Sequence, residues 1–196
     1  LPITVAIIYV VLNSNNEIEF IDKELVGIEY IQPTTKLIND VQTLRHMTTM
    51  QYKGYGGFDT SARHQFEKIN QGLGDIDDVN EKQGQGLGVY ERWNTIRNEW
   101  KADNFLLEDR SYESYQKITE SYNDYINKLM LFNISVADGS NLILDPEIIT
   151  YYLMSLTILD IPFFEEEHFK TMDTILDFDS RASTASEVNR SLLRVN

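Results

Sequence analysis

Apolar residues recur at spacings of three and four along nearly the whole chain, and this periodicity constrains the fold more than any other feature. Such spacing places apolar side chains on one stripe of an α-helix, and strand-like alternation is absent. The clearest run contains seven residues, Tyr115, Ile118, Tyr122, Tyr125, Leu129, Phe132 and Val136. Because each stripe must be buried against other helices, the sequence predicts an all-α fold, an elongated antiparallel bundle of about five to six helices.

Glycine, proline and polar residues mark where these helices begin and end. Breaks are predicted at residues 54–57, 84–88 and 138–141. The expected helices span about residues 17–51, 58–79, 89–104 and 109–136, followed by a last, kinked stretch from residue 146 to the end. Pro33 and Pro162 lie inside helical patterns, so each predicts a kink or a short interruption. A first helix of about 35 residues is roughly 50 Å long, so we expect a rod with long first and last helices.

The first segment, residues 1–12, carries no charged residue and stops at a polar run, residues 13–16. A membrane-crossing helix needs about 20 apolar residues, and a signal peptide begins with basic residues, so neither description fits. We interpret residues 1–13 as the distal part of a truncated transmembrane helix and residues 14–196 as a helical domain outside the membrane. A buried strand or a short core helix is the alternative interpretation of residues 1–12.

The C-terminal apolar residues repeat the same spacing, at Ala185, Val188, Leu192 and Val195. We therefore expect the entering and leaving helices to run side by side and to return the chain to the membrane. A second membrane helix is expected after residue 196.

Composition excludes several functions. The formal net charge is −14 and the pI is about 4.5, which argues against nucleic-acid partners, because phosphate neutralisation needs clustered lysine and arginine. The chain has no cysteine, so disulfides, thiolate metal sites and cysteine nucleophiles are excluded.

Little in the sequence points to catalysis. Glu165 and His168 form one Glu-x-x-His pair, but a di-iron bundle needs a second pair, which is missing. The run Gly84-Gln-Gly-Leu-Gly88 follows a polar stretch and lacks a Lys-Ser or Lys-Thr partner, so it predicts an interhelical turn instead of a phosphate loop. No nucleophile elbow is present. We therefore expect no metal, no cofactor and no enzymatic activity, with a di-iron enzyme as the weakest alternative.

Three stretches carry a resemblance to a known family. They read Lys-Glu-Leu-Val-Gly-Ile-Glu-Tyr-Ile-Gln-Pro at 23–33, Val-Gln-Thr-Leu-Arg at 41–45, and Asp-Gly-Ser-Asn-Leu-Ile-Leu-Asp-Pro-Glu-Ile-Ile-Thr-Tyr-Tyr-Leu-Met at 138–154. Together they are similar to the periplasmic helical sensor domains of bacterial methyl-accepting chemotaxis proteins and related sensor histidine kinases. Leu44 stands where that family usually has histidine, and His46 where it has glycine.

The resemblance implies a location at the bacterial inner membrane, with this domain in the periplasm. It also implies a parallel homodimer and signal transfer through two membrane helices to a cytoplasmic output module. The expected function is extracytoplasmic ligand sensing, with no chemistry performed on the ligand. The alternative is a membrane-anchored helical adaptor that docks another periplasmic protein, such as a periplasmic binding protein.

An anion or organic acid would need arginine partners inside this acidic domain. The candidate ligand-binding residues are arginines near aromatic side chains and a tyrosine pair: Arg45, Arg92, Trp93, Arg97, Tyr151 and Tyr152. Ordinary solvated or helix-pairing arginines, and tyrosines packed in the helix seam, are the alternatives.

The motif at 138–146 has a structural interpretation. Asp138 and Asn141 are expected to hydrogen-bond exposed backbone groups in a turn, and Asp145 to cap a helix that Pro146 opens. Ligand binding is expected to favour one of two helix arrangements through a small piston or rotation of the last helix, absorbed near Pro162.

Overall fold

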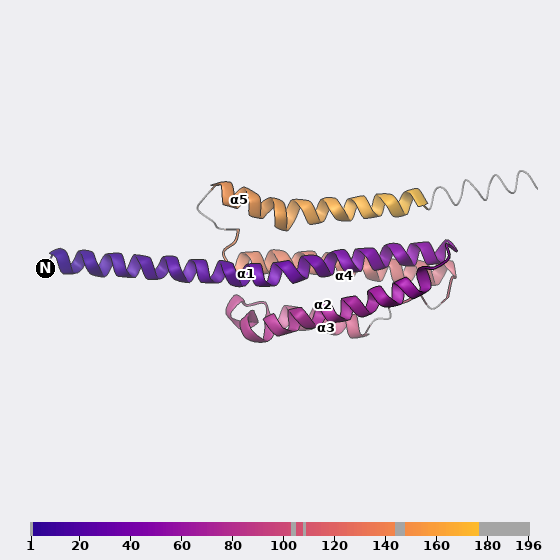
Figure 1. Ribbon diagram of the computed structural model, residues 1–196, viewed down its shortest axis with the longest axis horizontal. Coiled ribbons are helices and arrows are strands. Elements are labelled where there is room, and N and C mark those ends of the chain that lie inside the picture. The colour runs from indigo at the N-terminus through magenta and orange to yellow at the C-terminus, as the bar shows by residue number, and fades with distance from the viewer. Residues whose placement is uncertain (1, 103–104, 108, 144–147, 177–196) are drawn as a thin grey trace, which may run out of the picture.

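In the computed structural model, which describes residues 2–102, 105–107, 109–143 and 148–176, every regular element of the described chain is a helix. The elements are α1 (Pro2–Tyr52), α2 (Phe58–Leu87), α3 (Tyr90–Ala102), α4 (Tyr112–Gly139), α5 (Ile148–Ser155) and the π-helix η1 (Leu156–Asp160). Helical structure continues from η1 to residue 176, and Ile148–Leu176 is called the C-terminal helix below. The predicted all-α, elongated bundle is confirmed (Figure 1).

Four helices form the bundle. The chain runs along α1 to one end of the rod, returns along α2, runs out again along the shorter α3 and returns along α4 (Figure 1). α1 contacts α2 and α4, and α3 contacts the same two helices, so α1 and α3 lie on opposite sides of the α2–α4 pair. The packed residues of α1 lie in its second half, where burial begins near Val26.

The predicted seam of α4 faces the core. Ile118, Tyr122, Tyr125, Leu129, Phe132 and Val136 are all buried, as the spacing of three and four predicted. Trp100 of α3 lies 5.1 Å from Tyr125 of α4, and Trp93 of α3 lies 5.4 Å from Phe132 of α4, measured between ring centroids. Two tryptophans thus join α3 to α4 along the length of the shorter helix.

α1 is longer than the helix predicted at residues 17–51, because it is continuous with the segment interpreted as part of a membrane helix and begins at Pro2. Of the kink or short interruption predicted at Pro33, the helix shows no interruption. A proline inside a helix costs one backbone hydrogen bond and a steric clash, about 3 kcal/mol. The turns on both sides of Pro33 are held by fully buried side chains, including Tyr30, Thr34 and Leu37, and their packing outweighs that cost.

The break predicted at residues 84–88 is misplaced, because α2 continues through Gly84 and Gly86 and ends at Leu87. Gly88 terminates it in the left-handed conformation, with φ of 70°. Gly84 serves packing instead: a Cβ there would overlap the Asn80 side chain and come within 2.9 Å of the Tyr30 hydroxyl. Gly84 and Gly86 therefore both lie inside α2 in helical conformation, which does not require the conformational freedom of glycine.

α4 ends close to the predicted turn. It runs through Asp138 to Gly139, and Asn141 adopts a left-handed φ of 65°, which asparagine tolerates better than most residues. Asp138 contributes through its backbone, since its carbonyl accepts from the N–H of Asn141 at 3.3 Å. Asp145 and Pro146 lie outside the described residues.

The C-terminal helix runs parallel to α1. Arg45 meets Glu166 and His46 meets Asp173, so residue numbers rise in the same direction along both helices. The described chain therefore ends at the opposite end of the rod from Pro2 (Figure 1). The helix found beside α1 thus does not lead back toward its N-terminus, and the returning residues predicted at 185–195 lie outside the described part.

The kink expected near Pro162 takes the form of the π-helix η1. Pro162 has no N–H to bond Ile158 and its ring would clash with that carbonyl in a regular α-helix. The wider turn avoids the clash, and the N–H of Ile161 bonds the carbonyl of Leu156, five residues back.

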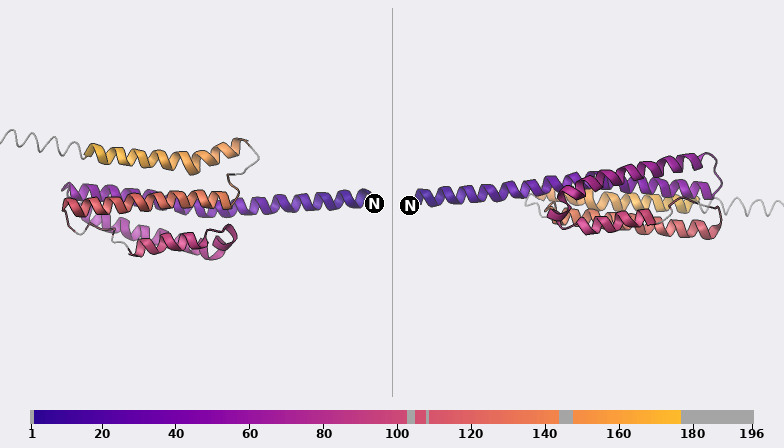
Figure 2. Two further views of the ribbon diagram at one scale, coloured as in Figure 1. Left: turned by 180° about the vertical axis from the view of Figure 1, so that it is seen from behind. Right: turned by 90° about the horizontal axis from the view of Figure 1, so that it is seen from below.

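The first half of α1 projects beyond the bundle as a single helix (Figure 2), and its residues 2–12 are called the apolar stub below. Its large apolar side chains, from Ile3 to Leu12, are 51–74% exposed. By length and composition, Ile148–Leu176 is the one helix in the described chain that is long and apolar enough to cross a membrane. The stub is too short to pass the same test alone.

Candidate ligand site

Arg45 lies near the end of α1 and is 1% exposed. Its guanidinium forms a two-pronged ion pair with Glu166 of the C-terminal helix: Nη1 lies 2.7 Å from Oε1 and Nη2 lies 3.1 Å from Oε2. This is the planar geometry in which arginine binds a carboxylate most tightly. Glu166 is itself buried, so both charges are removed from water.

Three further side chains complete what is called the Arg45 cluster below: Gln42, Asn123 and Asp173. Asn123 Oδ1 of α4 accepts from Arg45 Nη1 at 2.6 Å, and Gln42 Nε2 donates to Glu166 Oε2 at 2.9 Å. Asp173 Oδ2 lies 3.7 Å from Arg45 Nε, which has no hydrogen-bond partner in the described chain. The cluster joins α1, α4 and the C-terminal helix through polar contacts alone.

His46 extends the cluster toward solvent. Its Nδ1 lies 3.0 Å from Asp173 Oδ1, and its ring meets Phe169 edge-on at 6.5 Å. Two adjacent residues of α1, Arg45 and His46, thus share one carboxylate from the C-terminal helix.

A cavity of about 440 Å³ lies beside this cluster, between α4 and the C-terminal helix. Asn123 and Glu166 line it, so two direct partners of Arg45 form part of its wall. Asn127, Met130, Phe163 and Lys170 are also among its lining residues. The cavity therefore offers amide groups, apolar surface and one ammonium group next to a buried ion pair, together with the carboxylates of Asp124 and Glu167.

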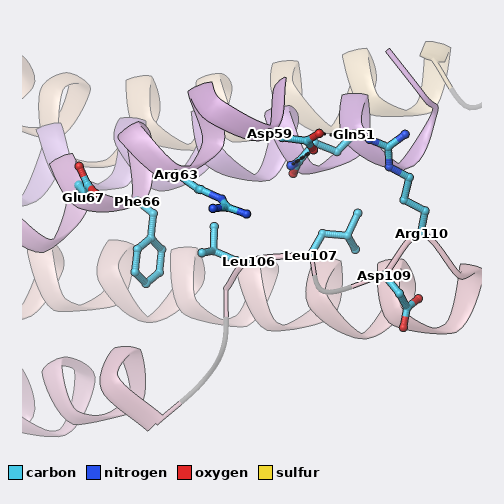
Figure 3. Close-up of a pocket in the computed structure, with 9 residues that line it drawn as sticks. All are labelled: Gln51, Asp59, Arg63, Phe66, Glu67, Leu106, Leu107, Asp109 and Arg110. Atoms are coloured by element: carbon cyan, nitrogen blue, oxygen red, sulfur yellow. Dashed lines mark hydrogen bonds and ion pairs between the residues drawn. The ribbon is translucent and has the colours of Figure 1, made fainter. Parts of the chain in front are cut away.

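A larger cavity, of about 520 Å³, lies near the far end of the bundle, between α2 and residues 106–110 (Figure 3). Its two arginines, Arg63 and Arg110, are outnumbered by the carboxylates of Asp59, Glu67 and Asp109. Arg110 already pairs with Asp59 at 3.5 Å, and Gln51 Nε2 donates to the same aspartate at 2.8 Å. Carboxylates outnumber cations in both cavities, and it is the smaller one that adjoins the buried guanidinium of Arg45.

The other predicted ligand residues lie elsewhere. Trp93 and Arg97 of α3 both contact Asp77 of α2, through Nε1 to Oδ1 at 2.7 Å and Nε to Oδ2 at 3.0 Å. Arg92 is exposed and donates to the hydroxyl of Ser135. These contacts hold α3 against its neighbours.

Tyr151 and Tyr152 lie on α5, with their rings 5.5 Å apart in an edge-to-face arrangement. They are 40% and 64% exposed and contact none of the three predicted arginines in the part of the chain that is described. The structure thus distributes the six predicted residues over four places, the Arg45 cluster, the α2–α3 contact, the contact of Arg92 with Ser135 of α4 and the face of α5.

Sequence reasoning missed the partners of Arg45. Glu166 stands in the run Glu165-Glu-Glu167, in which no local feature distinguishes it from its neighbours. Its burial follows from spacing: Ile158, Pro162, Glu166, Phe169 and Asp173 form a stripe at steps of four, four, three and four along the inner side of the C-terminal helix. A carboxylate inside such a stripe is the signal that would have identified it.

Glu165 and His168 do not join this stripe, and His168 is exposed. In the described ranges, no group of three or more histidine, aspartate or glutamate side chains is arranged to hold a metal ion.

Comparison with known proteins identifies no relative: no protein-family model, no curated protein and no solved structure matches the chain.

Proposed function

We propose that this chain is the extracytoplasmic sensor domain of a bacterial transmembrane signal transducer, a chemoreceptor or a sensor histidine kinase. The observation that carries the proposal is the continuity of α1. One unbroken helix contains both the projecting apolar stub and the buried Arg45, about 33 residues or roughly 50 Å apart. A change at the Arg45 cluster can therefore be transmitted mechanically to the stub.

The stub supports a membrane attachment. Its large apolar side chains are exposed on every side of the helix instead of on one stripe, which is unfavourable in water and suits a hydrocarbon surrounding. In this proposal the stub lies in the bacterial inner membrane and the bundle in the periplasm.

The signalling motion is a small piston or rotation of the C-terminal helix relative to α1. Two features support it. The contacts between these helices are mainly ion pairs and hydrogen bonds, which have discrete alternative partners. The π-helix before Pro162 gives the C-terminal helix a local point at which such a displacement can be absorbed.

A homodimer is part of the proposal, because each copy leaves large apolar side chains of the C-terminal helix uncovered. Ile149, Tyr152 and Phe164 are 64–75% exposed. Burial of such side chains at an interface is favourable by about 25 cal/mol per Å².

Cysteine crosslinking in membranes tests the sensor function without a known ligand. The natural chain has no cysteine, so single cysteines at the exposed positions Ile18, Ile21 and Leu25 report only on α1 of neighbouring copies. Glu166→Ala removes the partner of Arg45 and is expected to change the pattern of crosslinking rates at these positions. Asp78→Ala, which removes an equal charge from an exposed site on α2, is the control. Identical patterns in all three proteins would count against signal transmission through α1.

The same exposed apolar side chains favour a second candidate, a membrane-anchored adaptor that docks another periplasmic protein. An adaptor requires that surface and not the Arg45 cluster. Substitution of Ile149 and Phe164 by serine would abolish docking there, while Glu166→Ala would leave docking unchanged.

A further inference from the structure

We infer that the guanidinium of Arg45 is an exchangeable carboxylate-binding site, in which Glu166 is the resident occupant and a small organic monocarboxylate is the competing ligand. The inference deepens the proposed function and rests on it for its consequence, because exchange would release the C-terminal helix from α1. Binding itself is measurable whether or not the chain transmits a signal.

The site is built for a carboxylate. Both terminal nitrogens of Arg45 are directed at one carboxyl group, at 2.7 and 3.1 Å, and the fully buried Gln42 donates to the same group. Asn123 accepts from Nη1 and so orients the guanidinium. Any carboxylate that reached this position would find the same three donor groups already placed.

Glu166 has a second cation within reach. Lys170, one turn later on the same helix and about half exposed, lies 3.7 Å from Glu166 Oε1. Lys170 also lies 2.9 Å from Glu167 Oε1, so a Glu166 side chain that turns away from Arg45 would share this ammonium group with Glu167 near the surface. Displacement therefore does not strand a buried carboxylate, which is the main cost of breaking a buried ion pair.

The cavity provides the route. Glu166, Asn123 and Lys170 all line the space of about 440 Å³, so displacement of Glu166 exposes Nη1 of Arg45 to it. Space of this size accommodates a small molecule. A ligand can thus enter between α4 and the C-terminal helix without unfolding of the bundle.

The lining selects the ligand class. Met130 and Phe163 offer apolar surface for a short aliphatic tail, and Asn127 offers an amide. Asp124 and Glu167 also line the cavity, and their negative charges disfavour a second carboxylate on the ligand. The site is therefore suited to a monocarboxylate with a short apolar tail.

Exchange of Glu166 for a free carboxylate would weaken the attachment of the C-terminal helix to α1. Ile158 is its one buried large apolar side chain in the described structure, and Met154 and Leu159 pack against the core while partly buried; Ile149, Phe164 and Ile175 are 61–75% exposed. The Arg45 cluster supplies the buried ion pair that joins this helix to α1. Replacement of Glu166 by a free carboxylate removes the ion pair between the helices and keeps Arg45 compensated.

Chemical rescue tests the inference on the full chain in detergent. Glu166→Ala leaves Arg45 buried and without its main partner, and we expect the Tm to fall by roughly 10 °C. Propionate should restore several degrees with a saturating dependence on concentration, because it binds only the folded state. Sodium chloride and propylamine at the same concentrations should not raise the Tm in this way.

Two variants keep the test decisive. Arg45→Met combined with Glu166→Leu replaces the ion pair by apolar side chains of similar size and should fold without any response to propionate. Should Glu166→Ala fail to fold, Glu166→Gln retains the side-chain volume and removes the competing charge. In either single variant propionate should bind at least about tenfold more tightly than in the natural protein, measured by calorimetry.

Absence of saturable propionate binding in a folded single variant would overturn the inference, and so would an equal response in the double variant. The outcomes separate this inference from the proposed function. Propionate binding without any change in α1 crosslinking would refute the sensor function and support the carboxylate site. Altered crosslinking without propionate binding would refute the carboxylate site alone.

Discussion

The carboxylate of Asp77 accepts a hydrogen bond of 2.7 Å from the indole Nε1 of Trp93, a side chain that is fully buried between α2, α3 and α4. The second oxygen of Asp77 lies 3.0 Å from Arg97 Nε. One aspartate thus holds two of the residues that the sequence offered as ligand contacts, and it uses them to attach α3.

We predict that Asp77→Ala destabilises the protein by about 1–3 kcal/mol, because it leaves the buried indole N–H of Trp93 without an acceptor. Asp77→Asn retains an acceptor oxygen and should cost less. Asp78→Ala removes the same charge from the adjacent, exposed position and should change the free energy of unfolding by less than about 0.5 kcal/mol. Urea denaturation measures all three, and equal losses in Asp77→Ala and Asp78→Ala would refute the assigned role.

A close approach of α1 to the end of α4 predicts a severe effect at Gly27. A Cβ there would overlap the side chain of Ser140 and lie 2.7 Å from Leu142 Cδ1. Gly27→Ala is therefore expected to destabilise by about 1–3 kcal/mol, although alanine is the better helix former. Gly74→Ala, at a helical position with nothing within 4 Å, should stabilise by about 0.5–1 kcal/mol.

The contact itself can be checked by a second substitution. Ser140→Gly in the Gly27→Ala background removes two of the three overlapping atoms and should recover part of the lost Tm. No recovery would mean that the two helices do not meet at Ser140.

We predict opposite effects on stability for the removal of the hydroxyl group from two buried tyrosines of α4. Tyr122 donates a hydrogen bond to the carbonyl of Phe105, whereas the hydroxyl of Tyr125 has no partner among the described residues. Tyr122→Phe should cost about 1–2 kcal/mol, and Tyr125→Phe should be neutral or stabilising by up to about 1 kcal/mol. Thermal unfolding of both variants measures the difference, and the reverse order would contradict these contacts.

The same tyrosines predict a loss of stability in alkali. Burial raises the pKa of Tyr122 and Tyr125 above the ordinary 10.0. Above about pH 10 the unfolded chain releases these protons while the folded chain keeps them, so the free energy of unfolding falls as the pH rises and is unaffected below that range. Tyr125→Phe should make this decline shallower. Parallel stability curves for the variant and the natural protein between pH 9.5 and about 11 would exclude the contribution of Tyr125.

Removal of the apolar stub separates anchoring from folding. Deletion of residues 1–12 removes side chains that lie outside the bundle, so we expect the Tm to change by less than about 2 °C. In a liposome flotation assay, the natural chain should float with the liposomes and the truncated chain should not. A large fall in Tm would show instead that the stub belongs to the core.

Much of the fold follows from local sequence. Six of the seven residues that the step of three and four predicted for the seam of α4 are buried, and the predicted breaks at residues 54–57 and 138–141 lie at helix ends. The uninterrupted helix at Pro33 and the misplaced break at Gly84 have a common cause. Helix-breaking preference is a local quantity of a few kcal/mol at most, and the packing of Tyr30, Leu37 and their neighbours from other helices outweighs it.

Sequence reasoning could identify Arg45 as a candidate site residue but not its partner Glu166. Arg45 could be proposed because an anionic ligand needs an arginine partner inside an acidic domain, and Arg45 is one of three arginines near aromatic residues. Its partner could not, because Glu166 stands 121 residues away in a run of three glutamates that look alike. The stripe position of Glu166 distinguishes it from its neighbours only once the C-terminal helix is known to lie beside α1.

By itself, therefore, the sequence determined an elongated all-α bundle with its long helices, because helical periodicity depends on residues only three and four apart. Only the tertiary structure decided which residues surround Arg45, that Trp93 and Arg97 are occupied by Asp77, and that the C-terminal helix runs parallel to α1. These relationships depend on how whole helices are placed against each other, through contacts between residues far apart in the chain.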